Sequence, residues 1–168
     1  ENKSDWKKAI FEIIKKEQAS VLFIGVDFEL IPFALLKDEV EKNTECKIVV
    51  SNNQVLEIGN DKYLTYEFLK NNNLNYPETW LASEVSKAEI EYPCILKPRI
   101  GARSKGVYVI KDKDDLMNKI NKSSNVIIQQ LVGNEESEYT CGVLCLDNKI
   151  ISSIALRRYL KEGNTHIA

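Results

Sequence analysis

The chain has 168 residues, a formal net charge of −2, 43% hydrophobic residues and 29% charged residues. This length supports one domain or two small ones with a buried core, and the composition is that of a soluble globular protein. The basic residues form no run, which disfavours a general nucleic-acid role, and neither a membrane-spanning apolar segment nor a signal peptide is evident. The four cysteines form no C-x-x-C pair, which disfavours zinc and thioredoxin chemistry and fits a reducing cytoplasm.

The first part of the chain has the pattern of an α/β unit. Residues 5–18 carry apolar side chains at helical spacing, and the apolar run at 21–26 is typical of a buried parallel strand. A helix to about residue 43 and a strand at 46–50 complete a βαβ unit with a right-handed crossover. Asp27 and Glu29 follow the first strand at its carboxyl end, where α/β folds bind ligands. Capping of the next helix through its dipole is the alternative explanation, so both roles stay open.

The next elements are a helix, a connection and a strand. Residues 63–69 are predicted to form a helix with Asn60 or Asp61 as its N-cap. A turn-rich connection leads to a strand at 79–82, and residues 83–90 are predicted to form a short helix. A further helix is predicted at 112–121, N-capped by Asp112 or Asp114 and buried through Leu116, Met117 and Ile120.

Residues 94–110 are the most informative stretch and predict a strand, a glycine-bearing loop and a second strand. Alternate side chains of an extended chain share a face, so Lys97 and Arg99 are expected to point the same way, roughly 7 Å apart. Two cations held that close repel each other unless an anion lies between them. This pattern indicates an anion site, although an ordinary hairpin with two solvated cations explains it as well.

The loop of this hairpin contains Gly101, Ser104 and Gly106, which let backbone N–H groups approach a ligand closely. Val107 and Tyr108 stand where a P-loop has Lys-Ser/Thr, and they begin a strand instead of a helix. The hairpin is therefore a phosphate site in outline, but it is no P-loop.

The run Lys97-Pro98-Arg99-x-Gly101-x-x-Ser104-x-Gly106-Val107 resembles the phosphate-binding hairpin of the ATP-grasp superfamily, in its branch similar to the large chain of carbamoyl-phosphate synthase. The resemblance extends from about Trp6 to the C-terminus. It implies that the lysine, arginine, serine and glycines of this run bind the phosphates of ATP. It also implies that Lys62, after Asp61, begins the first ATP-grasp subdomain and reaches a nucleotide phosphate. A solvated surface lysine is the alternative for Lys62.

Residues 125–133 resemble the strand and hinge with which ATP-grasp proteins bind adenine through main-chain groups. The resemblance implies that the Gln130 carbonyl accepts from the adenine amino group and that the Val132 N–H donates to the ring, with Leu131 between them. The family usually has glutamate at the position of Gln130, a departure that leaves main-chain recognition unaffected.

Glu138 resembles the acidic residue after the hinge, whose carboxylate holds the ribose hydroxyls. Residues 139–146 alternate like a half-buried antiparallel strand, which a two-residue turn at 147–148 joins to a returning strand at 149–158. Arg158 resembles the family's arginine that faces the γ-phosphate or the acyl phosphate, and is the expected catalytic residue. An exposed arginine at a strand end is the alternative.

The resemblance also implies magnesium, because hard oxygen ligands must bridge the metal to the phosphates. After Glu138 the sequence contains only two carboxylates, Asp147 and Glu162, in a turn and in a loop. The magnesium ligands are therefore expected outside this chain, and no metal-binding residue is assigned within it.

The predicted fold class is α/β (α+β), in three parts. Residues 1–58 are expected to end a Rossmann-like domain that precedes an ATP-grasp domain, residues 59–131 to form the first ATP-grasp subdomain, and residues 132–168 to begin the second. By resemblance, the chain is a fragment of a ligase that activates a carboxylate or bicarbonate as an acyl phosphate for attack by an amine or ammonia. The fragment alone is expected to be inactive, and its exposed strand edges favour a homodimer or aggregation.

Two other classes stay open. One is a non-catalytic nucleotide-binding or interaction domain, and the other is an enzyme that uses a cysteine with His166, although no motif links those two residues.

Overall fold

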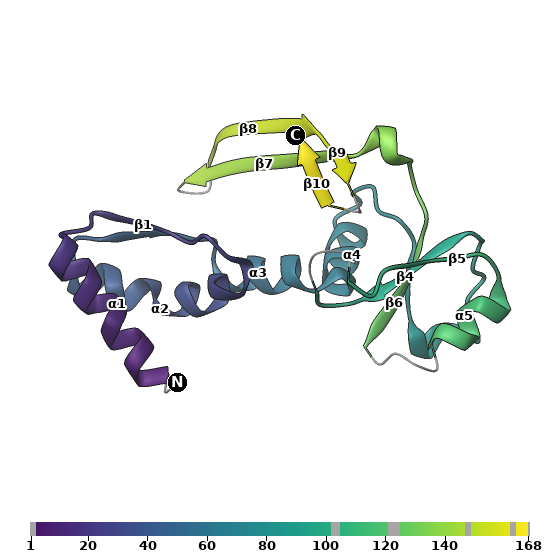
Figure 1. The fold of residues 1–168 in the computed structure, drawn as a ribbon, viewed down its shortest axis with the longest axis horizontal. Coiled ribbons are helices and arrows are strands. Elements are labelled where there is room, and N and C mark those ends of the chain that lie inside the picture. The colour runs from purple at the N-terminus through teal and green to yellow at the C-terminus, as the bar shows by residue number, and fades with distance from the viewer. Residues whose placement is uncertain (1–2, 102–104, 121–124, 147–148, 162–163, 168) are drawn as a thin grey trace. The chain divides into compact units, whose positions relative to one another are not determined.

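The computed structural model describes residues 3–101, 105–120, 125–146, 149–161 and 164–167 (Figure 1). It divides into two compact units, residues 1–64 and residues 65–168. Helices and sheets occur in both, so the predicted mixed α/β class is confirmed. Within the described ranges no helix has both the length and the apolar character needed to cross a membrane. The three-part division of the chain stays a prediction.

The first unit is built on a βαβ arrangement. In chain order its elements are helix α1 (Lys3–Glu17), strand β1 (Val21–Phe23), 3₁₀ helix η1 (Asp27–Glu29), helix α2 (Leu30–Asn43), strand β2 (Lys47–Val49) and helix α3 (Asn53–Asn60). Strands β1 and β2 pair in parallel, with Leu22 opposite Ile48. The predicted βαβ unit is therefore confirmed, although both strands are shorter than their apolar runs.

The core of this unit lies between helices α1 and α2 and the two strands. Its buried residues are Ile14, Phe33, Leu36, Val40, Cys46 and Ile48. The ring of Trp6 packs edge-on against Phe33, with centroids 5.0 Å apart. Asp27 begins η1, and Glu29 occupies the N-cap position of α2 without a side-chain capping hydrogen bond. The roles of these two carboxylates therefore stay open.

Asp61 ends one helix and begins the next. Its N–H donates to the Glu57 carbonyl at the end of α3, and its Oδ1 accepts from the Tyr63 N–H at 2.9 Å in the first turn of α4 (Lys62–Asn71). Of the two predicted N-caps, Asp61 is therefore the one used. Helix α3 was not predicted, although Asn52 caps it by accepting from the Val55 N–H at 2.9 Å.

The second unit contains a four-stranded antiparallel sheet. Its strands are β3 (Thr79–Leu81), β4 (Cys94–Pro98), β5 (Tyr108–Ile110) and β6 (Val126–Gln130), in the spatial order β3-β6-β4-β5. β4 and β5 form the predicted hairpin, with Leu96 opposite Tyr108. β6 comes last in the chain but inserts between β3 and β4. The order of strands in space therefore differs from their order in the sequence.

One face of this sheet is apolar and carries helix α5 (Lys113–Ile120). The buried residues of this core are Cys94, Leu96, Ile110, Leu116, Val126 and Ile128. Asp112 caps α5 as predicted, accepting from the Asp115 N–H at 2.9 Å. The predicted burial of Met117 is wrong, because it lies about 100° around the helix from the buried Leu116 and is 43% exposed.

Residues 83–90 do not form the predicted helix. They contribute instead to a single 3₁₀ turn, η2 (Ala82–Glu84), followed by turns. The Glu84 carboxylate accepts from the Leu81 N–H at 2.7 Å, which closes one turn locally without a longer helix.

The predicted hairpin near the end of the chain is confirmed. After 3₁₀ helix η3 (Glu135–Ser137), strand β7 (Tyr139–Leu146) pairs antiparallel with β8 (Lys149–Arg157), and β9 (Tyr159–Lys161) pairs with β10 (Asn164–Ile167). The predicted turn at 147–148 lies outside the described residues. The predicted half-burial of β7 is wrong, because all its side chains are exposed and no described core packs on either face of the ribbon.

Candidate nucleotide-binding site

Lys97 lies on the face of the four-stranded sheet opposite the face that carries α5. Residues opposite each other in an antiparallel pair share a face, so Thr79, Gln129 and Ile95 form one row of that face. Lys97, two residues after Ile95, lies on the same side. Its Nζ donates to Gln129 Oε1 at 2.6 Å, and Gln129 Nε2 donates to Thr79 Oγ1 at 2.8 Å. The predicted phosphate-binding lysine is thus held by a side-chain hydrogen-bond network.

The two described glycines of the β4–β5 connection both have positive φ angles. Gly106 has φ +73°, and a Cβ there would lie 3.1 Å from Cγ of Pro98. Gly101 has φ +156° and more space. The predicted phosphate ligand Ser104 lies outside the described residues. Gly106 therefore has a backbone conformation that L-amino acids adopt only with strain.

Arg99 follows β4 directly, and its side chain is half-buried. Its N–H donates to the Asn125 carbonyl at 3.1 Å, just before β6. The main chain at Arg99 is therefore anchored to the neighbouring strand, while the shared anion contact of Arg99 and Lys97 stays a prediction.

Strand β6 ends at Gln130, where the predicted hinge begins. The Gln130 N–H donates to the Glu78 carbonyl at 2.8 Å. In a regular antiparallel pair the Glu78 N–H would donate to the main-chain carbonyl of Gln130. Here it donates instead to the side-chain Oε1 of Gln130, at 3.3 Å. Leu131 and Val132 are 42% and 59% exposed. The segment assigned to adenine is thus an exposed strand end whose local pairing is irregular.

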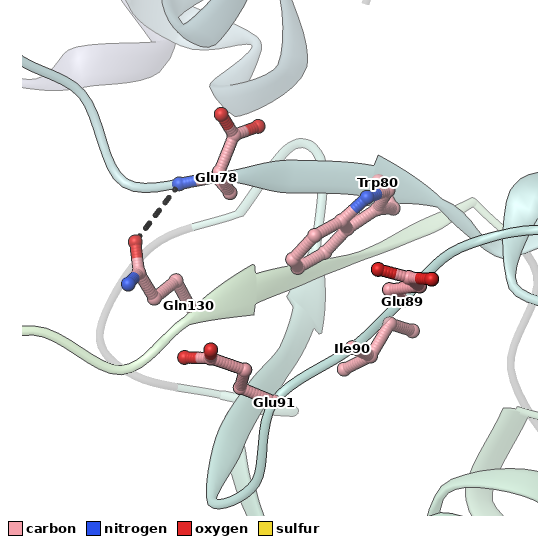
Figure 2. A pocket seen from close by; sticks show the side chains of 6 residues that line it. All are labelled: Glu78, Trp80, Glu89, Ile90, Glu91 and Gln130. Carbon is pink, nitrogen blue, oxygen red and sulfur yellow. Dashed lines mark hydrogen bonds between the residues drawn. The ribbon is translucent and has the colours of Figure 1, made fainter.

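A cavity of about 360 Å³ lies beside this strand end (Figure 2). It is lined by Glu78, Trp80, Glu89, Ile90, Glu91 and Gln130. Trp80 lies opposite Ile128 on the apolar face, so the cavity opens on the side of the sheet away from Lys97. The Glu78 carboxylate accepts from the Tyr66 hydroxyl at 3.3 Å. Three carboxylates disfavour polyphosphate binding, so this cavity is not the predicted phosphate site.

Lys62 opens helix α4 immediately after the capping residue Asp61. Burial lowers the pKa of the Lys62 ammonium below its usual value, while the nearby Asp61 carboxylate opposes that shift. Lys62 lies in the first unit and Lys97 in the second, so their predicted shared contact with nucleotide phosphates stays a prediction.

Glu138 and Arg158 lie next to each other at one end of the β7–β8 ribbon. The Arg158 N–H donates to the Glu138 carbonyl at 2.9 Å, and Arg158 Nη1 lies 3.4 Å from Glu138 Oε2. Their side chains are 28% and 41% exposed. The structure thus pairs two residues that the sequence assigned to different parts of the nucleotide.

Two residues on the Lys97 face of the sheet were missed by the sequence analysis. Gln129 and Thr79 contact the lysine network but belong to strands that precede and follow Lys97 by many residues. The sequence did contain one signal for Gln129: side chains alternate along a strand, so Gln129 faces away from the core that contains Ile128. Within the described ranges no group of three or more His, Cys, Asp or Glu residues could hold a metal ion.

The family model for the ATP-grasp domain matches residues 59–162, more than half of the chain. The chain belongs to the ATP-grasp family. It is 27% identical over 135 residues to carbamoyl-phosphate synthase of Methanobrevibacter smithii, an alignment that covers 79% of this chain and 36% of that protein. The resemblance recognised in the sequence is therefore confirmed.

Solved structures share the fold. N5-carboxyaminoimidazole synthetase of Staphylococcus aureus in complex with ADP matches 95% of this chain and 43% of its own, with a TM-score of 0.65 at 17% identity. The biotin carboxylase domain of Hydrogenobacter thermophilus 2-oxoglutarate carboxylase, in complex with MgADP, ADP and bicarbonate, matches 75% of this chain and 31% of its own, with a TM-score of 0.56 at 16% identity. The chain thus spans less than half the length of each of these three proteins. Its relatives are ATP-dependent ligases.

Proposed function

We propose that this chain is the ATP-binding portion of a ligase that activates a carboxylate or bicarbonate as an acyl phosphate, which an amine or ammonia then attacks. The observation that carries the proposal is the position of Lys97, whose Nζ donates at 2.6 Å to a neutral amide and which is followed by a glycine-bearing connection. Family membership supports it, because this arrangement occurs in the part of the chain that matches the ATP-grasp model.

The phosphate end of the nucleotide is assigned to the β4–β5 hairpin and to α4. Lys97, Arg99 and Lys62 supply positive charge, and backbone N–H groups near Gly101, Ser104 and Gly106 donate to phosphate oxygens. Burial of Lys62 supports its role, because a partly desolvated ammonium gains more from an anionic partner than a solvated one does.

The adenine end is assigned to the exposed strand end of β6. The Gln130 carbonyl accepts from the amino group and the Val132 N–H donates to the ring, beside Leu131. The Glu78 N–H donates to the Gln130 side chain instead of the main-chain carbonyl, which supports a role for that carbonyl in binding adenine.

The ribose is assigned to Glu138 and the transferred phosphoryl group to Arg158. Their ion pair is partly exposed, and such pairs contribute only about 0–1 kcal/mol, so little free energy opposes its opening. Nucleotide hydroxyls and phosphates then replace the partners that the two side chains have in this structure.

Magnesium supplies the remaining positive charge and aligns the phosphate oxygens when it is bound. After Glu138 the sequence contains only two carboxylates, Asp147 and Glu162, so we infer that the magnesium ligands lie outside residues 1–168. Neither ligation nor appreciable ATP hydrolysis is expected from this portion alone.

The test is nucleotide binding by the 168-residue chain and by its longer parent, where one exists. Saturating ATP at about 100 times its Kd adds roughly 2.7 kcal/mol, which raises the Tm of a chain of this size by about 5–10 °C. Lys97→Ala should abolish most of that shift, whereas Lys87→Ala, at an exposed turn, should leave it unchanged. An unchanged Tm with both ATP and ADP would refute the proposal.

A further inference from the structure

We propose that Thr79 is a positioning residue for Lys97: its buried hydroxyl fixes the amide of Gln129, and that amide holds the Lys97 ammonium in place. The inference rests on the proposed function, in which Lys97 binds a nucleotide phosphate. Three side chains from three strands carry it, namely Thr79 on β3, Gln129 on β6 and Lys97 on β4.

The hydrogen-bond direction at Thr79 is fixed by its neighbour. Its residue is 2% exposed, and Oγ1 lies 2.9 Å from the Pro77 carbonyl oxygen. A carbonyl oxygen only accepts, so the single hydroxyl proton of Thr79 is donated there. Oγ1 is therefore an acceptor toward Gln129, 2.8 Å away, and requires the NH₂ end of the amide.

The other end of the amide confirms this orientation. Gln129 Oε1 lies 2.6 Å from Lys97 Nζ, and an ammonium only donates. A flipped amide would place NH₂ against the ammonium and an oxygen against a hydroxyl whose proton is already committed. Both ends of Gln129 therefore select the same orientation, and a change at Thr79 is transmitted to Lys97.

This arrangement prepares Lys97 for an anion in two ways. A free lysine side chain samples many rotamers, and ordering it before the ligand arrives reduces the entropic cost of binding. The Gln129 amide is also uncharged, so this hydrogen bond orients the ammonium without cancelling its charge.

The first measurement needs no nucleotide. The rate at which an amine-acylating reagent modifies Lys97 is followed by peptide mass spectrometry in the wild-type 168-residue chain and in variants. Thr79→Val is expected to raise this rate severalfold, because the amide no longer holds the amine, and Thr79→Ser is expected to restore it. Thr44→Val is the matched control, since the Thr44 hydroxyl also donates to a carbonyl, that of Val40, and accepts from an N–H, that of Cys46. It should leave Lys97 reactivity unchanged.

The second measurement is a double-mutant cycle on ADP binding. Loss of a hydrogen bond to a charged group corresponds to about a tenfold loss of affinity, which is the effect expected of Thr79→Val. In a Lys97→Ala background the same substitution should have no further effect. Gln129→Met, at a half-buried position, removes the acceptor directly and should reproduce both results even if Thr79→Val does not fold.

The outcomes separate this inference from the function on which it rests. Unchanged Lys97 reactivity in Thr79→Val and Gln129→Met overturns the positioning role. An equal loss of ADP affinity with and without Lys97 also overturns it, because the effect then does not pass through Lys97. Absence of ADP binding by the wild type refutes the proposed function, while the reactivity measurement still decides the contact between the three side chains.

Discussion

Arg158 and Glu138 pair twice at the end of the β7–β8 ribbon, through a 2.9 Å main-chain hydrogen bond and a 3.4 Å contact between Nη1 and Oε2. The main-chain bond fixes which residues lie opposite each other, and the side-chain contact brings opposite charges together on the same rung. If Glu138 binds the ribose and Arg158 a phosphoryl group, nucleotide binding exchanges this pair for contacts with the ligand.

A substitution at Glu138 should therefore affect affinity more than stability. Glu138→Ala is expected to change the free energy of unfolding by less than about 1 kcal/mol, because the pair is partly exposed. It should weaken ATP binding about tenfold, since a charge-assisted hydrogen bond to the ribose is lost. Urea unfolding and calorimetric titration measure the two effects.

A ribose analogue tests the assignment of Glu138 directly. The affinity for 2′,3′-dideoxy-ATP should be equal in the wild type and in Glu138→Ala, because that ligand lacks the hydroxyls. Glu136→Ala, at an exposed position in η3, is the control and should leave both affinities unchanged. An equal loss for ATP and the dideoxy analogue would remove the ribose from the role of Glu138.

Lys62 should make stability depend on pH in the alkaline range. Burial lowers its pKa below the ordinary value of 10.5, so between the folded and unfolded pKa values the unfolded chain binds more protons, and the free energy of unfolding rises with pH. Lys62→Met should therefore stabilise the chain at pH 7, with a gain that disappears near pH 10.5. Urea unfolding at several pH values measures this gain.

The control for Lys62 is Lys42→Met on the exposed face of α2, for which no such pH dependence is expected. A stability difference between wild type and Lys62→Met that stays constant from pH 7 to pH 10.5 would show that the charge is not the cause.

Local sequence signals predicted the elements of the site but not its network. The β4–β5 hairpin and the Asp61 cap depend on residues close together in the chain, and both are confirmed. The contacts of Gln129 with Lys97 and Thr79 join residues 32 and 50 positions apart. They require β6 to insert between β3 and β4, and a single strand's alternation does not contain that order.

The error on β7 has a different physical origin. Alternation of Tyr139, Cys141, Val143 and Cys145 with their neighbours predicts a face to be buried, but it does not provide the layer that buries it. In the structure both faces of the ribbon are exposed. A periodic pattern thus predicted the strand correctly and its burial incorrectly.

Gly106 should be intolerant of a side chain. Gly106→Ala would combine a φ of +73° with a Cβ 3.1 Å from Pro98 Cγ, and the left-handed region alone costs roughly 1–2 kcal/mol for an L-residue. The variant is expected to lose about that much stability and to bind ATP more weakly, because the hairpin connection shifts. Thermal unfolding and titration with ATP measure these losses.

Gly59→Ala is the matched control, because Gly59 lies in helix α3 with nothing within 4 Å of the added Cβ. Alanine is favoured over glycine in a helix by about 0.5–1 kcal/mol, so this variant should be stabilised and bind ATP normally. Equal stability changes in the two glycine variants would contradict the conformational argument.

The exposed β7–β8 ribbon should make the chain self-associate. Ile150, Ile151 and Ile154 are 73%, 57% and 55% exposed on β8, and Val143 is 61% exposed on β7. Such apolar surface, together with the strand edges of a two-stranded ribbon, favours association with another copy. We expect an apparent mass that rises with protein concentration in sedimentation equilibrium. Ile150→Lys should lower that mass, because one large apolar side chain is replaced by a charge.

Ser152→Lys, two residues away on the same strand, is the control. It adds the same charge while removing almost no apolar area, so its effect should be clearly smaller. Equal effects of the two lysines would attribute the change to charge repulsion, and a monomer at all concentrations would show that the ribbon does not drive association.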